Sequence, residues 1–320
     1  MACKSGLFAI TAVAAVFLGG CINLPGLTPT KLERVVVQKS PRWFETNRIA
    51  LVDVDGFIGS GVLAWFTGGG TTVADVKEKL NLAAEDGGVR AVVLRINSPG
   101  GEASASDMIH QEVLRFKEKT NKPVIAAFTG TATSGAYYVA CAADYIVASP
   151  TSVTGSVGVI MQFVNVEGLY GKIGLRSEVI KSGKMKDIGS PTRMLTPEER
   201  AVLQGINTAL FEQFLQAVRK GRPNMTREQV DVIREGSVVS AQEAERLNMV
   251  DGIGYLEEAI AKARERAGIR AADVILYRAF PTYNSNIYAR PGVDLLVEGG
   301  MEFLLRRHGP TFLYLWSPGY

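Results

Sequence analysis

The sequence predicts an α/β fold in which a mainly parallel sheet is flanked by helices on both faces. Short runs rich in β-branched residues alternate with longer segments of helical periodicity. Helices of this length between consecutive strands are typical of right-handed crossovers, which join parallel strands. The first strand-like run, residues 48–56, is apolar enough for a buried strand. These observations indicate repeated strand–helix–strand units.

The same patterns place the elements in order along the chain. The expected strands are residues 48–56, 89–96, 123–128 and 274–280. The expected helices are residues 73–84, 103–119, 136–143, 201–220 and 256–267. The long helix at 201–220 carries an apolar stripe that we expect to face the core.

Composition narrows the function classes. A chain of 320 residues with 47% hydrophobic content can bury a sizeable core. The net charge of +3 is nearly balanced and gives no case for a nucleic-acid partner, which normally needs a clustered basic face, so we expect none. We also expect no cofactor and no metal.

The first 21 residues have the pattern of a processing segment. Lys4 precedes a short apolar stretch at residues 7–18, and Leu18-Gly-Gly-Cys21 closes it. This ending resembles a bacterial lipobox, which implies cleavage before Cys21 and lipidation of its thiol. The apolar stretch falls short of the roughly 20 residues that a spanning helix needs. An uncleaved short anchor is the alternative.

Ser134 is the candidate nucleophile. It lies where a strand-like run ends at small residues and a helix begins, a position at which a serine can be exposed. The loops at residues 97–101 and 129–134 both follow predicted strands, so they should meet at one edge of the sheet. There the N–H groups of Gly100, Gly101 and Gly135 could form an oxyanion hole.

A serine nucleophile needs a base, and the chain contains only two histidines, His110 and His308. We expect His110 on a helix surface and His308 in a surface tail, so a neutral lysine is the better candidate. Lys181, Lys184 and Lys186 lie close enough to lower one another's pKa by repulsion. Spacing alone does not choose among these three. Asp187 could pair with Lys186 and keep it charged, or it could hold the loop instead.

Several motifs occur in the order typical of one family. They are Leu94-Arg-Ile-Asn-Ser-Pro-Gly-Gly101, Ala132-Thr-Ser-Gly-Ala-Tyr-Tyr138, Thr154-Gly-Ser-Val-Gly-Val-Ile160, Lys181-Ser-Gly-Lys-Met-Lys-Asp187 and Glu235-Gly-Ser-Val-Val-Ser-Ala-Gln-Glu-Ala244. With these motifs, residues 48–269 resemble the short single-domain form of the signal peptide peptidase SppA (protease IV) family. The resemblance implies a ClpP/crotonase-like fold of repeated βαβ (ββα) units.

The resemblance also implies roles for single residues. Ser134 occupies the nucleophile position, Lys186 the general-base position, and Gly100, Gly101 and Gly135 the oxyanion region. Ala136 and Met185 depart from the family, which commonly has glycine and an aromatic residue at these positions. Neither departure removes a reacting atom, so they bear on the shape of the substrate pocket.

The resemblance implies a membrane-associated Ser-Lys endopeptidase that cleaves apolar peptides, such as signal peptides left after secretion. A ring-shaped homo-oligomer is expected, in which Ser134 of one protomer meets Lys186 of another. The expected domains are a leader at 1–21, a tether at 22–47, a peptidase domain at 48–270 and a C-terminal extension at 271–320. Lipidated Cys21 would anchor the protein in the bacterial cell envelope, facing the periplasm or the exterior.

The sequence is also compatible with two other function classes. A crotonase-like acyl-CoA enzyme would share the sheet and the oxyanion loops, although the leader and Ser134 disfavour it. An inactive ring-forming scaffold that binds peptides would keep the fold without the chemistry.

Overall fold

The computed structural model describes residues 32–42, 44–59, 70–278 and 313–315. The leader with Cys21, and His308, lie outside these residues. No helix within the described ranges is both long and apolar enough to cross a bilayer.

The central sheet has nine strands among the described residues and is mainly parallel. Its main path runs in the order β1 (Glu33–Gln38), β12 (Asp273–Arg278), β2 (Arg48–Asp55), β5 (Val89–Ser98), β7 (Val124–Thr133), β8 (Tyr145–Ala148) and β11 (Gly252–Ile253). Only β1 is antiparallel to its neighbour on this path. Beside the path, β9 (Val153–Gly155) pairs parallel with β7, and β10 (Val238–Ser240) pairs antiparallel with β9. The predicted fold class, a mainly parallel sheet flanked by helices, is confirmed.

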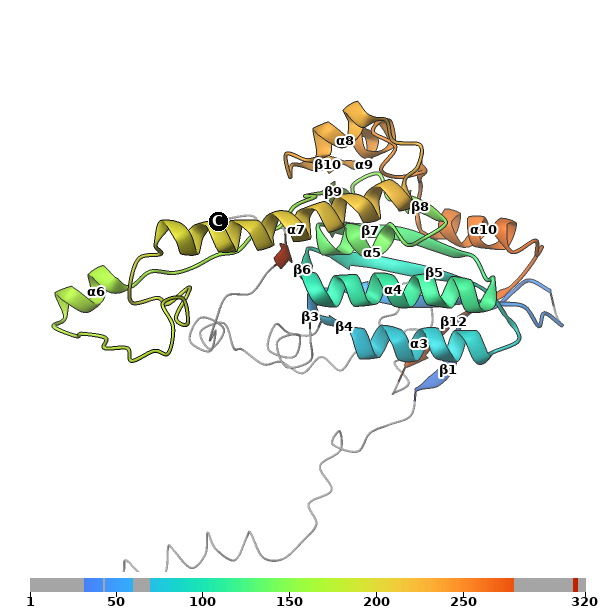
Figure 1. Ribbon diagram of the computed structural model, residues 1–320. Coiled ribbons are helices and arrows are strands. Elements are labelled where there is room, and N and C mark those ends of the chain that lie inside the picture. Colours follow the sequence, from blue (N-terminus) through green and yellow to red (C-terminus); the bar gives the residue numbers. More distant parts are fainter. Residues whose placement is uncertain (1–31, 43, 60–69, 279–312, 316–320) are drawn as a thin grey trace, which may run out of the picture.

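Helices cover both faces of this sheet because its strands are apolar on both. One face packs on α3 (Val73–Glu85), α4 (Ala103–Thr120), α5 (Gly135–Ala140) and α7 (Pro197–Gly221). The other face packs on α10 (Leu256–Arg266), as Figure 1 shows. Alternate residues of β2 divide between the two layers, with Val52 on the first side and Leu51 on the second. Beyond the sheet, α8 (Arg227–Ile233) and α9 (Ala241–Arg246) follow α7.

A smaller sheet lies at the carboxyl ends of the central strands. Its order is β13 (Leu313–Leu315), β6 (Gly100–Glu102), β3 (Phe57–Gly59) and β4 (Gly70–Thr72). β13 pairs antiparallel with β6, with Tyr314 opposite Gly101 and Leu315 opposite Gly100. The last described strand therefore lies along the glycine loop that the sequence singles out.

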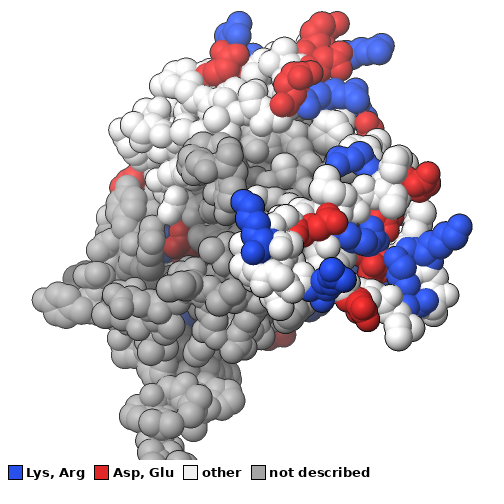
Figure 2. Space-filling view, turned by 90° about the vertical axis from the view of Figure 1, so that its left-hand side faces the viewer, with Lys and Arg blue, Asp and Glu red and all other residues white. Residues whose placement is uncertain are grey.

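Residues 160–195, here called the arm, extend away from the sheet and return to the start of α7 (Figure 1). The arm contains α6 (Glu167–Lys172), in which no residue is buried. Apolar side chains are exposed along it, including Val164 at 65% and Ile180 at 103%. On the face drawn in Figure 2, basic and acidic side chains are interspersed with uncharged surface. Exposed apolar side chains gathered on one segment are typical of a contact surface.

The structure changes two predicted boundaries. Residues 33–38 lie inside the expected 22–47 tether, yet they form β1, which pairs with β12 and buries Val37. The tether prediction is wrong for this stretch, because a short apolar run gains a partner from the far end of the chain. β12 belongs to the same sheet, so the folded domain continues past residue 270 into the expected extension.

Candidate active site

Ser134 lies at the junction of β7 and α5, in a conformation unusual for serine. Its φ of 54° and ψ of −118° place it at positive φ, where residues with a Cβ are rare. The Ser134 N–H donates to the Gly155 carbonyl at 2.8 Å, and the Ser134 carbonyl accepts from Tyr138 at 2.9 Å. A backbone held in this way costs on the order of 1–3 kcal/mol, and such strain is concentrated at functional sites.

The hydroxyl of Ser134 is buried and unpaired. The expectation of an exposed serine is wrong, because the residue is 1% exposed; Oγ has no hydrogen-bond partner among the described residues. Leaving a buried hydroxyl unpaired costs about 1–3 kcal/mol. The full donor and acceptor capacity of Oγ is therefore open to a base and a substrate carbonyl.

The two predicted loops meet at one edge of the sheet, as expected. Ser98 pairs with Ala132 where β5 and β7 end. The side-chain oxygen of Asn97 accepts the Thr131 N–H at 3.2 Å, and α5 packs against β6. The glycine loop and the start of α5 are thereby brought together, because neighbouring parallel strands end at the same edge.

The three glycines of the predicted oxyanion region have different surroundings. The Gly100 N–H donates to Ser98 Oγ at 3.1 Å, so this group already has a partner. A Cβ on Gly101 would lie 1.9 Å from the Ile58 carbonyl oxygen, so only glycine fits between β6 and β3. Gly135 is the first residue of α5, where a helix leaves its N–H groups unpaired. Their role in holding an oxyanion stays a prediction.

His110 does not lie on the surface, so that expectation is wrong. It is 5% exposed on α4 because α5 covers this side of the helix, and its ring lies edge-on to Tyr138 at 5.0 Å. Burial lowers the pKa of His110 to about 4, so the imidazole is neutral at neutral pH. Since Ser134 Oγ has no partner among the described residues, His110 is not hydrogen-bonded to it.

Lys186 lies in a turn of the arm with an exposed side chain. Its N–H donates to the Gly183 carbonyl at 3.1 Å. Within the described part of the chain, its ammonium group has no ion pair or hydrogen bond, and Ser134 Oγ is likewise unpartnered. A single chain thus holds the predicted nucleophile and the predicted base without contact between them.

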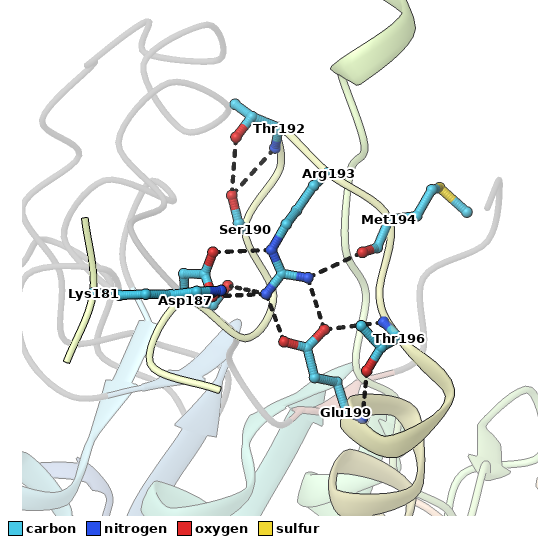
Figure 3. Close-up of polar contacts among 8 residues, drawn as sticks. All are labelled: Lys181, Asp187, Ser190, Thr192, Arg193, Met194, Thr196 and Glu199. Carbon is cyan, nitrogen blue, oxygen red and sulfur yellow. Dashed lines mark hydrogen bonds and ion pairs between the residues drawn. The ribbon is translucent and has the colours of Figure 1, made fainter. Parts of the chain in front are cut away.

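Asp187 does not pair with Lys186. Its carboxylate accepts from Lys181 Nζ at 2.6 Å and from Arg193 Nη2 and Nε at 2.7 and 2.9 Å (Figure 3). Hydrogen bonds from Arg193 and then Lys181 hold the pKa of Asp187 well below its usual value. Of the two alternatives left open by the sequence, Asp187 therefore holds the loop. The same contacts distinguish Lys181, which is ion-paired, from Lys186.

Arg193 and Glu199 were missed by the sequence analysis, although they connect the arm to α7. Arg193 Nη1 and Nη2 donate to the Glu199 carboxylate at 2.8 and 2.5 Å. Glu199 also caps the helix with Thr196, whose N–H donates to its carboxylate at 3.0 Å. The hydrogen bonds from Arg193 and then Thr196 lower the pKa of Glu199 to about 2. The spacing Thr196-Pro-Glu-Glu199 is a capping-box signal that could have identified this glutamate.

The comparison with known proteins places the chain in a family. The family described as Peptidase family S49 matches residues 116–270. "Putative protease slr0021" from Synechocystis is 35% identical over 223 residues, which cover 70% of this chain and 76% of that protein. The chain belongs to peptidase family S49. The matched residues include Ser134 and Lys186, whereas Gly100 and Gly101 precede them.

Other relatives in family S49 carry related names and different lengths. "Protease 4" from Haemophilus influenzae is 35% identical over 219 residues, covering 68% of this chain but only 35% of that protein. "Putative signal peptide peptidase SppA" from Enterococcus faecium is 36% identical over 200 residues, covering 62% of this chain and 58% of that protein. The predicted membership of the SppA (protease IV) family is confirmed. This chain spans about a third of the length of the Haemophilus relative.

Proposed function

We propose that the protein is a serine endopeptidase in which Ser134 is the nucleophile and Lys186 the general base. The observation that carries the proposal is the strained, buried Ser134, whose Oγ has no partner in the described structure. Membership of a peptidase family supports a hydrolytic role for such a serine. Lysine is the base because His110 is buried, has a lowered pKa and makes no contact with Ser134 Oγ.

The chemistry follows from the proposed roles. Ser134 Oγ attacks a peptide carbonyl carbon while neutral Lys186 accepts the hydroxyl proton. Backbone N–H groups near Gly135 and the glycine loop hold the negative oxygen of the tetrahedral intermediate. Lys186 then gives its proton to the departing amine as the C–N bond breaks. Water attacks the acyl-enzyme, with Lys186 again taking a proton, and Ser134 is restored.

The site requires a second protomer in this proposal. Ser134 lies in the body of the molecule, whereas Lys186 lies on the arm and does not contact it within one chain. The arm also exposes apolar side chains such as Val164 and Ile180, which a neighbouring protomer would cover. A ring of copies would place Lys186 of each arm beside Ser134 of a neighbour.

The proposed substrates are apolar peptides, including signal peptides that remain after secretion. The Enterococcus relative carries the name of a signal peptide peptidase. At Gly100–Glu102, β6 pairs antiparallel with β13, and this pairing supports a substrate that binds in extended form beside the glycine loop. Lipidated Cys21 would tether the enzyme to a membrane of the cell envelope, where such peptides occur.

Purified variants test the reaction and the shared site together. We expect Ser134→Ala and Lys186→Ala each to abolish cleavage of an apolar peptide, while the neighbouring Lys184→Ala retains it. Mixing the two inactive chains should restore part of the activity, because some interfaces then pair an intact serine with an intact lysine. Full activity of either single variant would refute the assignment, and no recovery on mixing would refute the shared site.

A fluorophosphonate probe separates the enzyme from a peptide-binding scaffold. Labelling of assembled wild-type protein at Ser134 is expected, with none in Ser134→Ala. An assembled protein that binds apolar peptides but resists the probe would favour the scaffold.

A further inference from the structure

Arg193 is the centre of an ionic cluster that joins the Lys186 turn to the first turn of α7. Its guanidinium lies between the carboxylates of Asp187 and Glu199 and contacts both (Figure 3). Asp187 directly follows Lys186 in the sequence. Arg193 therefore contacts the residue that is next to the proposed base in the sequence.

The α7 end of this connection is firmly placed. Glu199 is 2% exposed and forms a reciprocal capping box with Thr196. Further along α7, Phe214 and Val218 are fully buried in the main core. Arg193 binds Glu199 through two nitrogens. Because its guanidinium group is planar, this contact fixes both the distance and the orientation of the arm relative to α7.

The carboxylate next to Lys186, that of Asp187, is already hydrogen-bonded. Arg193 and Lys181 both donate to Asp187. The cluster thus contains two cations, Lys181 and Arg193, and two anions, Asp187 and Glu199, whose charges balance. Besides Lys186 itself, the turn also carries Lys184. Without Arg193, an excess negative charge would lie next to Lys186 and favour its charged form.

We propose that Arg193 is a positioning residue for Lys186, fixing its turn to α7 and keeping the Asp187 carboxylate away from it. This inference rests on the proposed role of Lys186 as general base. Arg193 touches neither substrate nor reacting atoms. Its effect is on the place of the lysine and on the charge beside it.

The test is the pH dependence of kcat and kcat/KM in assembled enzyme, because a neutral base gives an acid limb that reports its pKa. Arg193→Ala should lower kcat about tenfold or more and shift the acid limb about one pH unit upward, with little change in KM. Asp187→Asn keeps the Arg193–Glu199 contact and should shift the limb downward, the opposite direction. The double variant Arg193→Ala/Asp187→Asn should return the limb toward its original position while kcat stays low.

Arg193→Lys keeps the positive charge but loses the planar guanidinium group, which donates to one carboxylate through two nitrogens. It should leave the acid limb near its original position and still lower kcat, and it carries the test if Arg193→Ala fails to fold. Arg246→Ala is the matched control, since Arg246 binds Glu243 through two nitrogens at 2.6 and 2.9 Å on the distant α9. This control should change neither kcat nor the limb.

The outcomes separate this inference from the proposed function. Activity in Lys186→Ala would refute the lysine as base. If Lys186→Ala is inactive but Arg193→Ala keeps the original kcat and limb, the positioning role is overturned. It is also overturned if kcat falls while the limb stays unmoved in both Arg193→Ala and Asp187→Asn, since Arg193 would then be only a structural brace.

Discussion

The N–H of Ser134 donates to the carbonyl of Gly155, and the 2.8 Å contact ties the proposed nucleophile to β9. Gly155 has a φ of +92° and pairs with Val238 of β10. The strand beside β7 therefore takes part in holding the serine backbone at positive φ. Gly155 gave no sign of this role in the sequence beyond its place in a Thr-Gly-Ser motif.

Gly155→Ala should destabilise the protein and slow the reaction of Ser134. The new Cβ would lie 2.6 Å from the Ser237 carbonyl oxygen and would also face an unfavourable φ. We expect a loss of about 1–3 kcal/mol in the free energy of unfolding, measured with urea, and slower fluorophosphonate labelling. Gly158→Ala is the control, since no atom lies within 4 Å of its Cβ position. Equal effects of the two substitutions would contradict the prediction.

Ser134→Gly should stabilise the fold while removing activity. Glycine accepts the φ of 54° without strain and leaves no unpaired buried hydroxyl. The free energy of unfolding should rise by about 1 kcal/mol, measured by urea unfolding beside Ser134→Ala, which keeps the backbone strain. A glycine variant less stable than the alanine variant would argue against stored strain at this position.

Asp251→Asn should be destabilising because it breaks an ion pair in which the arginine is buried and the aspartate side chain is 23% exposed. Arg222 Nη1 and Nη2 donate to the Asp251 carboxylate at 2.6 and 2.8 Å, and the Arg222 side chain is 7% exposed. Removing one partner of a fully buried pair costs about 3–5 kcal/mol, and we expect a smaller loss here because water reaches the Asp251 carboxylate. Glu243→Gln breaks an exposed pair with Arg246 and should leave the unfolding free energy nearly unchanged. Denaturant titration of both variants checks the contrast.

His110 should make stability depend on pH between about 6.5 and 4. Its pKa falls from 6.5 to about 4 in the folded state because burial disfavours the charged ring. The unfolded chain thus binds more protons in this window, so stability is complete above pH 6.5 and is lost as the pH falls, by about 3 kcal/mol in all. His110→Phe should flatten the slope between pH 6.5 and 4.5 in urea unfolding. An unchanged slope would mean that other groups titrate there.

Local patterns predicted the parts of the fold that depend on neighbouring residues. The run at β5 and the first half of β7 are strongly apolar, and the expected ends of these two strands correctly located the two loops that meet near Ser134. The end of β7 was missed because Thr129–Thr133 consists of threonine, glycine and alanine, with no large apolar side chain, and it forms a strand by pairing with β9. β1 was missed for a similar reason, since its partner comes from the far end of the chain.

In the candidate site, too, local sequence identified residues, whereas their conformation and contacts depend on distant parts of the chain. Ser134 was recognisable from its strand-to-helix junction, but its positive φ depends on the contact with Gly155. The burial of His110 depends on α5 packing over α4, which no spacing along α4 reveals. The choice of Asp187 between Lys186 and Arg193 depends on where the arm returns to α7.

Strand β1 also limits the distance that can separate the folded domain from Cys21. Glu33 is fixed in the sheet, and twelve positions along the sequence separate it from Cys21. A chain of that length reaches at most about 40 Å when fully extended. A lipid on Cys21 would therefore keep the β1 edge of the sheet within about one membrane thickness of the bilayer surface, and the enzyme would search along the membrane rather than through the surrounding solution.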